Sequence, residues 1–372
     1  MSLTVLQVLP ALDAGGVEKG TVEVAAELSR HGHTALVMSA GGRMVQDLAD
    51  LGVAHIAWPV GRKRLSTLRY IPALRRLLRE RHIDIVHMRS RLPAWIVWLA
   101  WRGLDPADRP HLVTTVHGPY SVNRYSAIMT RGERVIAIST PIREYILNHY
   151  PGTNPGRIRL IHRGVDPADY PHGYHPDDAW LTAWWRDYPE TRGRYLITLP
   201  ARITRWKGQM DFVHLLDRLV HAGEDVHGLI VGGAEPRRQD FLHELEARIE
   251  TLGLGLRITL TGHRTDLREV LAISDLSLSL AREPEAFGRT TLEALRLGTP
   301  VIGYDHGGTG EILAAMLPAG LVPLGDIGAL SERVREFIRN RPEVAHSDRF
   351  TLQEMLDKTL AVYQELSDPP CS

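Results

Sequence analysis

Two carboxylates frame the run EAFGRTTLE, in which seven residues separate Glu285 from Glu293. Phe287 and Gly288 form a turn between them, and a helix is predicted over Thr290–Leu297. The first turn of a helix has backbone N–H groups without intrahelical partners, and these groups suit phosphate. We expect one carboxylate to take sugar hydroxyls and the other a ribose, so that the run binds a nucleotide sugar. Each glutamate alone could be an ordinary loop or helix charge.

Two cations, Arg202 and Lys207 in the run ARITRWKG, follow a strand predicted at Tyr195–Pro200. A loop at this end of a strand would face a ligand, and the two cations could neutralise a diphosphate without a metal ion. The alternative is a pair of solvated surface charges.

Two further signals lie in the first half of the chain. Gly15 and Gly16 separate a strand predicted at Thr4–Leu9 from a helix, and two glycines let a backbone come close to a ligand. A tight turn alone would also favour glycine. His117 directly follows another predicted strand and could contact a ligand, or it could be a buried, hydrogen-bonded histidine.

Short apolar runs alternate with amphipathic helical segments through both halves of the chain. This alternation predicts an α/β fold with parallel sheets covered by helices on both faces. We predict two Rossmann-like, doubly wound domains that face a central cleft, where ligands bind at the carboxyl ends of strands. The predicted domains are residues 1–170, joined by a C-terminal helix at about 350–372, and residues 190–348. The Pro-, Asp-, Tyr- and Trp-rich stretch 166–194 is the predicted linker.

Composition and motifs exclude several classes of protein. The chain has 372 residues, of which 44% are hydrophobic and 24% charged, as in ordinary globular proteins. It lacks the glycine fingerprint of dinucleotide-binding proteins and the Walker A sequence. Its single cysteine, Cys371, excludes an internal disulfide and fits a reducing compartment. The N-terminus does not resemble a signal peptide, and we expect a cytoplasmic protein.

Taken in order, these motifs resemble those of the family-4 retaining glycosyltransferases, which have the GT-B fold. The resemblance covers nearly the whole chain, and the two-glutamate motif with its Phe-Gly centre is its most specific part. The segments Gly15–Ala25 and His87–Trp95 are similar to those of bacterial enzymes that build lipopolysaccharide or related surface glycans. The matching pieces are Gly15-Gly16, His117-Gly118, HRGVD (His162–Asp166), Arg202 with Lys207-Gly208, Glu285 with Phe287-Gly288 and Glu293, LGTPVIG (Leu297–Gly303) and Gly307-Gly308.

The resemblance implies a role for each matching residue. Arg202 and Lys207 would bind the donor diphosphate, Glu293 the ribose, and His117 a sugar hydroxyl. Gly16 would let the first-domain loop touch the diphosphate. The remaining donor-binding residues are Gly15, the base-proximal Gly262, His263 and Arg264, the sugar-binding Glu285 with the backbone of Ala286, Phe287 and Gly288, and the helix start at Arg289 and Thr290. His117, Arg202, Lys207 and Glu285 would be catalytic.

The expected function is transfer of a hexose-type sugar, with retention of configuration, from a UDP- or GDP-sugar to a lipid-linked or lipopolysaccharide-type glycan acceptor. We expect no metal and no cofactor, and attack on the same face that the leaving group departs from. The alternatives are a nucleotide-sugar epimerase or hydrolase of the same fold, or a non-catalytic two-domain protein that binds sugar nucleotides.

Residues 62–82 hold eight Lys or Arg residues and one acid, Glu80. Leu68, Ile71, Leu74, Leu77 and Leu78 recur at helical spacing, so we predict a basic amphipathic helix that contacts an anionic membrane surface. The alternative is an ordinary helix with a charged outer face. Residues 1–165 as a whole carry 22 basic and 12 acidic residues, a balance of +10, which favours an anionic partner. We therefore expect peripheral attachment at the inner membrane. Nucleic acid is not expected as a partner, because no binding motif accompanies the charge.

Overall fold

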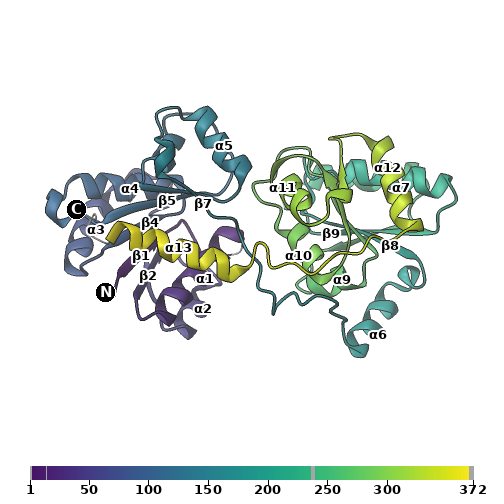
Figure 1. Ribbon diagram of the computed structural model, residues 1–372, viewed down its shortest axis with the longest axis horizontal. Helices are drawn as coiled ribbons and strands as arrows, with labels where there is room; N and C mark the ends of the chain where they lie inside the picture. The colour runs from purple at the N-terminus through teal and green to yellow at the C-terminus, as the bar shows by residue number, and fades with distance from the viewer. Residues whose placement is uncertain (1, 14, 236–238, 368–372) are drawn as a thin grey trace. The chain divides into compact units, whose positions relative to one another are not determined.

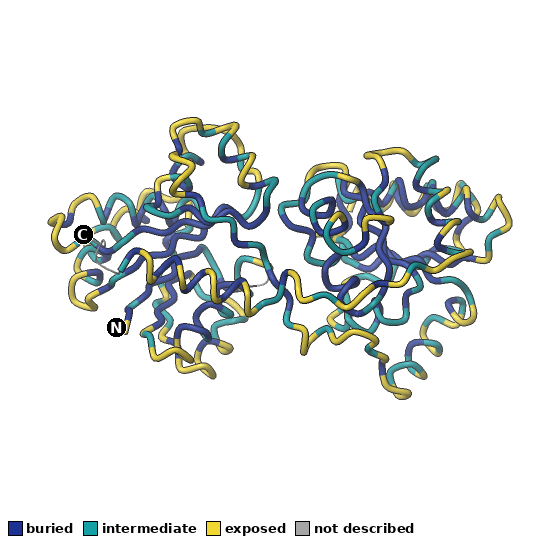
Figure 2. Tube along the Cα trace, in the orientation of Figure 1, coloured by how far each residue is buried: buried dark blue, intermediate teal, exposed yellow. Residues whose placement is uncertain are grey.

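The computed structural model describes residues 2–13, 15–235 and 239–367, so Cys371 lies outside the described residues. The chain forms two compact units (Figure 1). Unit 1 comprises Met1–His162 and Gln353–Ser372, and unit 2 comprises Arg163–Leu352. In both units the central strands are buried, and the exposed residues concentrate on the outer helices and loops (Figure 2).

Unit 1 is built on a seven-stranded parallel sheet in the order β3-β2-β1-β4-β5-β6-β7. The order reverses between β1 and β4, as it does in doubly wound folds. Most residues of the strands are apolar, as expected for a parallel sheet with helices on both faces. They are β1 (Thr4–Val8), β2 (Thr34–Ser39), β3 (Ala54–Ala57), β4 (Ile85–Met88), β5 (His111–Val116), β6 (Arg134–Ala137) and β7 (Ile158–Leu160).

The helices of unit 1 alternate with the strands along the chain. Most follow the carboxyl end of a strand, and the crossovers return the chain to the amino end of the next strand. They are α1 (Gly16–Arg30), α2 (Val45–Asp50), α3 (Tyr70–Glu80), α4 (Arg91–Arg102), α5 (Thr140–His149) and α13 (Leu352–Ser367), with the 3₁₀ segments η1 (Leu65–Arg69), η2 (Pro106–Asp108), η3 (Ser126–Thr130) and η4 (Pro155–Arg157).

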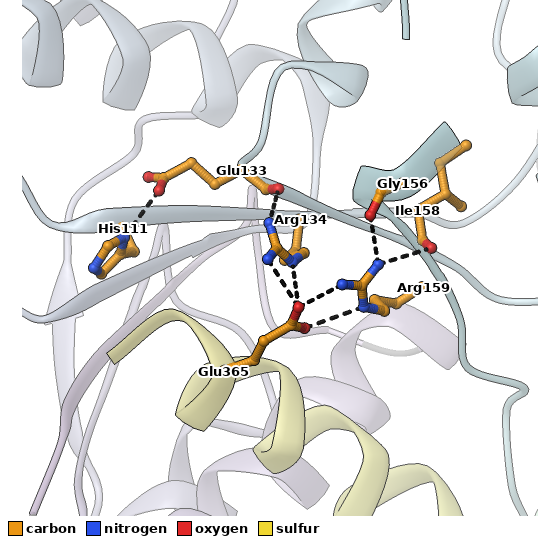
Figure 3. A network of polar contacts seen from close by, with 7 residues as sticks. All are labelled: His111, Glu133, Arg134, Gly156, Ile158, Arg159 and Glu365. Carbon is orange, nitrogen blue, oxygen red and sulfur yellow. Dashed lines mark hydrogen bonds and ion pairs between the residues drawn. The ribbon is translucent and has the colours of Figure 1, made fainter. Parts of the chain in front are cut away.

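The C-terminal helix α13 belongs to unit 1, as predicted. Tyr363 is fully buried, and its hydroxyl lies 2.6 Å from Nδ1 of His87 on β4. Glu365 forms ion pairs with Arg134 on β6 at 2.8 Å and with Arg159 on β7 at 2.5 Å (Figure 3). The buried Tyr363–His87 contact and the two ion pairs of Glu365 therefore hold α13 to β4, β6 and β7.

Unit 2 is built on a six-stranded parallel sheet in the order β10-β9-β8-β11-β12-β13, which reverses between β8 and β11. Its strands are β8 (Tyr195–Pro200), β9 (Val226–Val231), β10 (Ile258–Gly262), β11 (Leu276–Ser279), β12 (Val301–Tyr304) and β13 (Leu321–Val322). Its helices are α6 (Asp178–Asp187), α7 (Gln209–His221), α8 (Gln239–Thr251), α9 (Leu267–Ile273), α10 (Arg289–Leu297), α11 (Gly307–Met316) and α12 (Ile327–Arg339), with η5 (Pro189–Thr191) and η7 (Pro318–Gly320). The predicted α/β class with two doubly wound sheets is therefore confirmed.

The predicted linker 166–194 is largely an integral part of unit 2. Asp177 caps helix α6 by accepting a hydrogen bond from the Trp180 N–H. Trp184 is only 2% exposed and packs with Leu229 and Val231 of β9 and with Val270. The packing of α6 on β9 explains why unit 2 includes residues before 190.

The basic segment 62–82 is not one continuous α-helix. The 3₁₀ helix η1 precedes α3, and only Leu74 and Leu78 of α3 are buried. Arg75 is turned inward, where its Nε donates to the Ala100 carbonyl at 3.1 Å. Arg75 is therefore half-buried and bonded to α4, whereas the other seven cations of the segment are exposed. None of the described helices has the length and apolar character needed to cross a membrane.

Candidate functional site

The candidate site of unit 2 lies where its strand order reverses. In an open parallel sheet, ligands bind outside the carboxyl ends of the two strands at such a switch point. The loop after β8 carries Arg202 and Lys207, and the loop after β11 carries Glu285. The topology therefore brings together charged residues that lie about eighty positions apart in sequence.

Lys207 and Glu285 form an ion pair across these two loops. Nζ of Lys207 lies 2.6 Å from Oε1 of Glu285, and the side chains are only 17% and 15% exposed. The same Nζ lies 4.4 Å from the ring centre of Trp206, within cation–π range. Trp206 and Glu285 therefore fix the position of the ammonium group.

The two loops are also joined through their backbones. The Arg282 N–H donates to the Trp206 carbonyl at 2.7 Å, and the Arg282 guanidinium forms an ion pair with Asp211 at the start of α7. Asp211 is fully buried and accepts a second hydrogen bond, of 2.7 Å, from the Tyr304 hydroxyl. Burial and the bond to Asp211 raise the pKa of Tyr304, so it stays a donor.

Helix α11 holds Glu285 from the other side. The Gly308 N–H donates to the Glu285 carbonyl at 2.8 Å. A Cβ on Gly308 would lie 2.2 Å from the Phe287 carbonyl oxygen, which is closer than any real contact. Only glycine at position 308 therefore allows α11 to approach this loop so closely.

Helix α10 begins directly after this loop. Its N-cap residue, Gly288, has φ +89°, a left-handed conformation that glycine adopts without steric cost, and no side chain caps the helix. Phe287 is 5% exposed, and its ring packs edge-on against Phe350 at 5.9 Å. Ala286 precedes it in the same loop. The first backbone N–H groups of the helix, at Arg289 and Thr290, lie at its positive end.

Glu293 is held in place on the first turns of α10. Its side chain is 7% exposed and pairs at 2.9 Å with Nε of Arg289. The Tyr170 phenol lies beside Glu293, and burial first, then the negative charge of Glu293, raise the pKa of this phenol. No sequence pattern marks Tyr170 as a site residue, because it lies in the predicted linker and only the fold brings it to α10.

Arg202 is placed differently from Lys207. Its side chain is 68% exposed and pairs at 3.0 Å with Glu235, in the loop after β9. Its carbonyl accepts a 2.9 Å hydrogen bond from Nε2 of Gln209. In this structure Arg202 therefore pairs with a carboxylate of the neighbouring loop and not with Glu285.

The residues predicted to lie near the base follow β10. Gly262 has φ +70° and ends the strand at a register shift, and the exposed His263 follows it. Arg264 forms a two-bond ion pair with Asp266, of 2.8 Å and 2.5 Å. Its guanidinium also lies 5.3 Å from the Trp184 ring. Arg264 is therefore bound into the packing of α6, while His263 is the more accessible of the two.

The unit 1 residues also follow the carboxyl ends of their strands. Gly15 is the N-cap of α1 with φ +139°, and a Cβ on Gly16 would meet no atom within 4 Å. The N–H of His117 donates to the Tyr120 hydroxyl at 3.3 Å. Arg91 lies 4.9 Å from the ring centre of Tyr120, so the loop after β5 is tied to α4.

Known families match both halves of the chain. Residues 14–169 match the family described as Glycosyltransferase Family 4, and residues 184–351 match Glycosyl transferases group 1. The two matched regions together include all the site residues described above except Tyr170.

Individual relatives are glycosyltransferases as well. A lipopolysaccharide core biosynthesis mannosyltransferase of Rhizobium meliloti is 28% identical over 177 residues, which is 45% of this chain and 50% of the relative. The crystal structure of a glycosyltransferase from Rickettsia africae is 29% identical with a TM-score of 0.86 and covers 98% of both chains. The Anabaena protein HepE, whose structure contains UDP-glucose, has the same fold at 20% identity, with a TM-score of 0.80 over 97% of this chain and all of its own. This chain therefore belongs to the family-4 glycosyltransferases and has the GT-B fold.

Proposed function

We propose that this protein transfers a hexose, with retention of anomeric configuration, from a UDP- or GDP-sugar to a lipid-linked or lipopolysaccharide-type glycan. The observation that carries the proposal is the Lys207–Glu285 ion pair at the switch point of unit 2, next to the uncapped start of α10. A cation and free N–H groups suit a diphosphate, and the adjoining carboxylate suits sugar hydroxyls.

The leaving group determines the roles of the unit 2 residues. When the bond between the anomeric carbon and the diphosphate breaks, negative charge accumulates on the diphosphate. Lys207, Arg202 and the N–H groups at the start of α10 stabilise this charge and so lower the barrier. Glu285 and the backbone of residues 286–288 hold the sugar, and Glu293 holds the ribose.

The acceptor hydroxyl attacks the anomeric carbon on the face that the diphosphate leaves. Its oxygen forms the new bond, and its proton passes to the departing phosphate oxygen, so no enzymic nucleophile is needed. In unit 1, His117 binds a sugar hydroxyl and Gly16 admits the diphosphate. Because protein cations neutralise the leaving group, the reaction proceeds without a divalent ion, and EDTA leaves the rate unchanged.

The acceptor side of the proposal rests on the basic segment of unit 1. Seven of its eight cations are exposed, and Leu65 and Leu68 of η1 are 87% and 48% exposed. Exposed leucines among cations suit an anionic membrane surface that presents a lipid-linked acceptor. The relative from Rhizobium meliloti, named as a lipopolysaccharide mannosyltransferase, supports an acceptor of this class.

Thermal-shift measurements with UDP-, GDP-, ADP- and CMP-sugars test the donor. A UDP- or GDP-sugar is expected to raise the melting temperature, and NMR of the product is expected to give the donor's anomeric configuration. Inversion of configuration, or a covalent sugar adduct on Glu285, would contradict the proposed mechanism. Release of free sugar without an acceptor at the full turnover rate would point to a hydrolase instead.

A further inference from the structure

Unit 1 contains a cavity of about 590 Å³ that the proposed reaction does not use. Leu112, Glu133 and Arg157, which line it, lie at the amino ends of β5, β6 and β7. His117, in contrast, follows the carboxyl end of β5. The cavity therefore lies across the length of a strand from the residues proposed to bind the donor, and its volume is typical of small-molecule sites.

One wall of this cavity is apolar and aromatic. Trp98 and Trp101 of α4 line it together with Leu112 and Val122, and Val122 is 54% exposed. The Trp101 indole N–H donates to the Pro110 carbonyl at 2.8 Å, which fixes that ring. An apolar chain or ring of a ligand would find a preformed surface here.

The rim of the cavity is cationic. Arg124, Arg131 and Arg157 line it, and within the described part of the chain none of them forms an ion pair. Arg131 lies 5.0 Å from the Trp98 ring centre. Glu133, a carboxylate of the same lining, is occupied by His111 at 2.9 Å and by the Leu112 N–H at 3.1 Å. The rim thus has uncompensated positive charge.

Thr153 supplies a second, independent sign of a ligand. It lines the cavity and is 8% exposed, and its Oγ1 has no hydrogen-bond partner among the described residues. A buried hydroxyl without a hydrogen-bond partner is destabilising. Because Thr153 lines the cavity, rotation of its side chain would let a phosphate or carboxylate held by the arginines accept a hydrogen bond from this hydroxyl.

We propose that this cavity binds an amphipathic anion, an apolar chain or ring that carries a phosphate, at a site separate from donor binding. The tryptophan wall takes the apolar part, and the three arginines with Thr153 take the anionic group. Charge and apolar surface act together, so neither inorganic phosphate nor an uncharged alcohol is a sufficient ligand.

Binding of octyl phosphate below its micelle concentration, measured by calorimetry on the full chain, tests the proposal. Octyl phosphate is expected to bind at least tenfold more tightly than either inorganic phosphate or octanol. Arg131→Gln and Arg157→Gln are each expected to weaken it about tenfold. Arg102→Gln is the matched control, because Arg102 lies 4.8 Å from the same Trp98 ring but does not line the cavity.

Thr153→Val keeps the side-chain shape and removes the unpartnered hydroxyl, so it provides a second measurement. The variant is expected to melt at a higher temperature and to bind octyl phosphate more weakly. No binding of octyl phosphate, equal affinity in all the variants, or equally tight binding of inorganic phosphate would overturn the proposal.

Discussion

Lys207 and Glu285 are 2.6 Å apart, yet they lie on loops after two different strands of the second sheet. Their contact depends on the neighbouring positions of β8 and β11, where the strand order reverses. In this structure the carboxylate orients the ammonium group. In the proposed reaction the same ammonium group turns to the diphosphate while Glu285 holds the sugar.

Lys207→Ala is expected to lower kcat/KM for transfer by about 100- to 1,000-fold, the range that follows loss of one preorganised charge-stabilising group. The rate would be measured with the donor that gives the largest thermal shift. The matched control is Arg205→Ala, on the same loop, because Arg205 pairs with Glu244 on the exposed surface. Equal activity of the Lys207 variant and the control would show that Lys207 has no part in transfer.

The positions of these residues could be predicted because they lie on loops, or on the helix after a loop, that follow predicted strands. The strand at Tyr195–Pro200 and the turn before α10 are local patterns, so Arg202, Lys207 and Glu285 could be placed on loops after strands, and Glu293 on the helix that follows. Their partners could not be placed. The pairing of Arg202 with Glu235, rather than with a ligand-facing neighbour, depends on how β8 and β9 lie side by side.

The largest failure concerns residues 166–194, which we predicted to be a linker. Proline and aspartate suggested irregular structure, but the tryptophans of α6 bury against β9. Burial of large aromatic side chains outweighs local turn preference. The same error concealed Tyr170 and its contact with Glu293, which no local pattern could reveal.

Tyr170→Phe removes the hydroxyl that lies beside Glu293 and retains the ring. Loss of about 1 kcal/mol of positioning energy corresponds to about a fivefold rise in KM for the donor, with a smaller change in kcat. Tyr174→Phe is the control, since the Tyr174 hydroxyl donates to Glu269. If both variants changed KM equally, the effect would come from general loosening of this segment and not from Glu293.

Gly308→Ala places a Cβ against the Phe287 carbonyl, 2.2 Å away without relaxation. Relieving this overlap must shift the loop that carries Glu285, at a cost of about 1–3 kcal/mol. We expect a lower melting temperature and loss of transfer together. Gly255→Ala is the control, because a Cβ there meets no atom within 4 Å and φ is not positive. An active Gly308→Ala enzyme would contradict the importance of this close approach.

We predict that membrane binding by unit 1 depends on the exposed leucines of η1 more than on α3. Replacing Leu65 and Leu68 with serine is expected to weaken binding to phosphatidylglycerol vesicles about tenfold or more, since both leucines are exposed and would bury apolar area in the bilayer. Arg75→Gln is expected to lower the melting temperature instead, because Arg75 donates to the Ala100 carbonyl. Vesicle binding that fell only in the Arg75 variant would reverse this assignment.

Glu365 makes the attachment of α13 dependent on pH. Hydrogen bonds from Arg134 and Arg159, opposed by partial burial, lower the pKa of this carboxyl to about 2 (Figure 3). A depressed carboxyl pKa contributes stability that is fully present above the unfolded-state value and is lost as pH falls towards the folded-state value. The side chain is 36% exposed, so solvent screening limits the contribution to about 1 kcal/mol.

Urea unfolding at several pH values should therefore find Glu365→Gln less stable than the parent at pH 6, with the difference in unfolding free energy shrinking between about pH 4.5 and pH 2. Glu354→Gln provides the control, because Glu354 pairs with Lys358 within the same helix and does not contact the sheet through that pair. A difference at Glu365 that persisted unchanged at pH 2 would mean that shape, and not charge, attaches the helix.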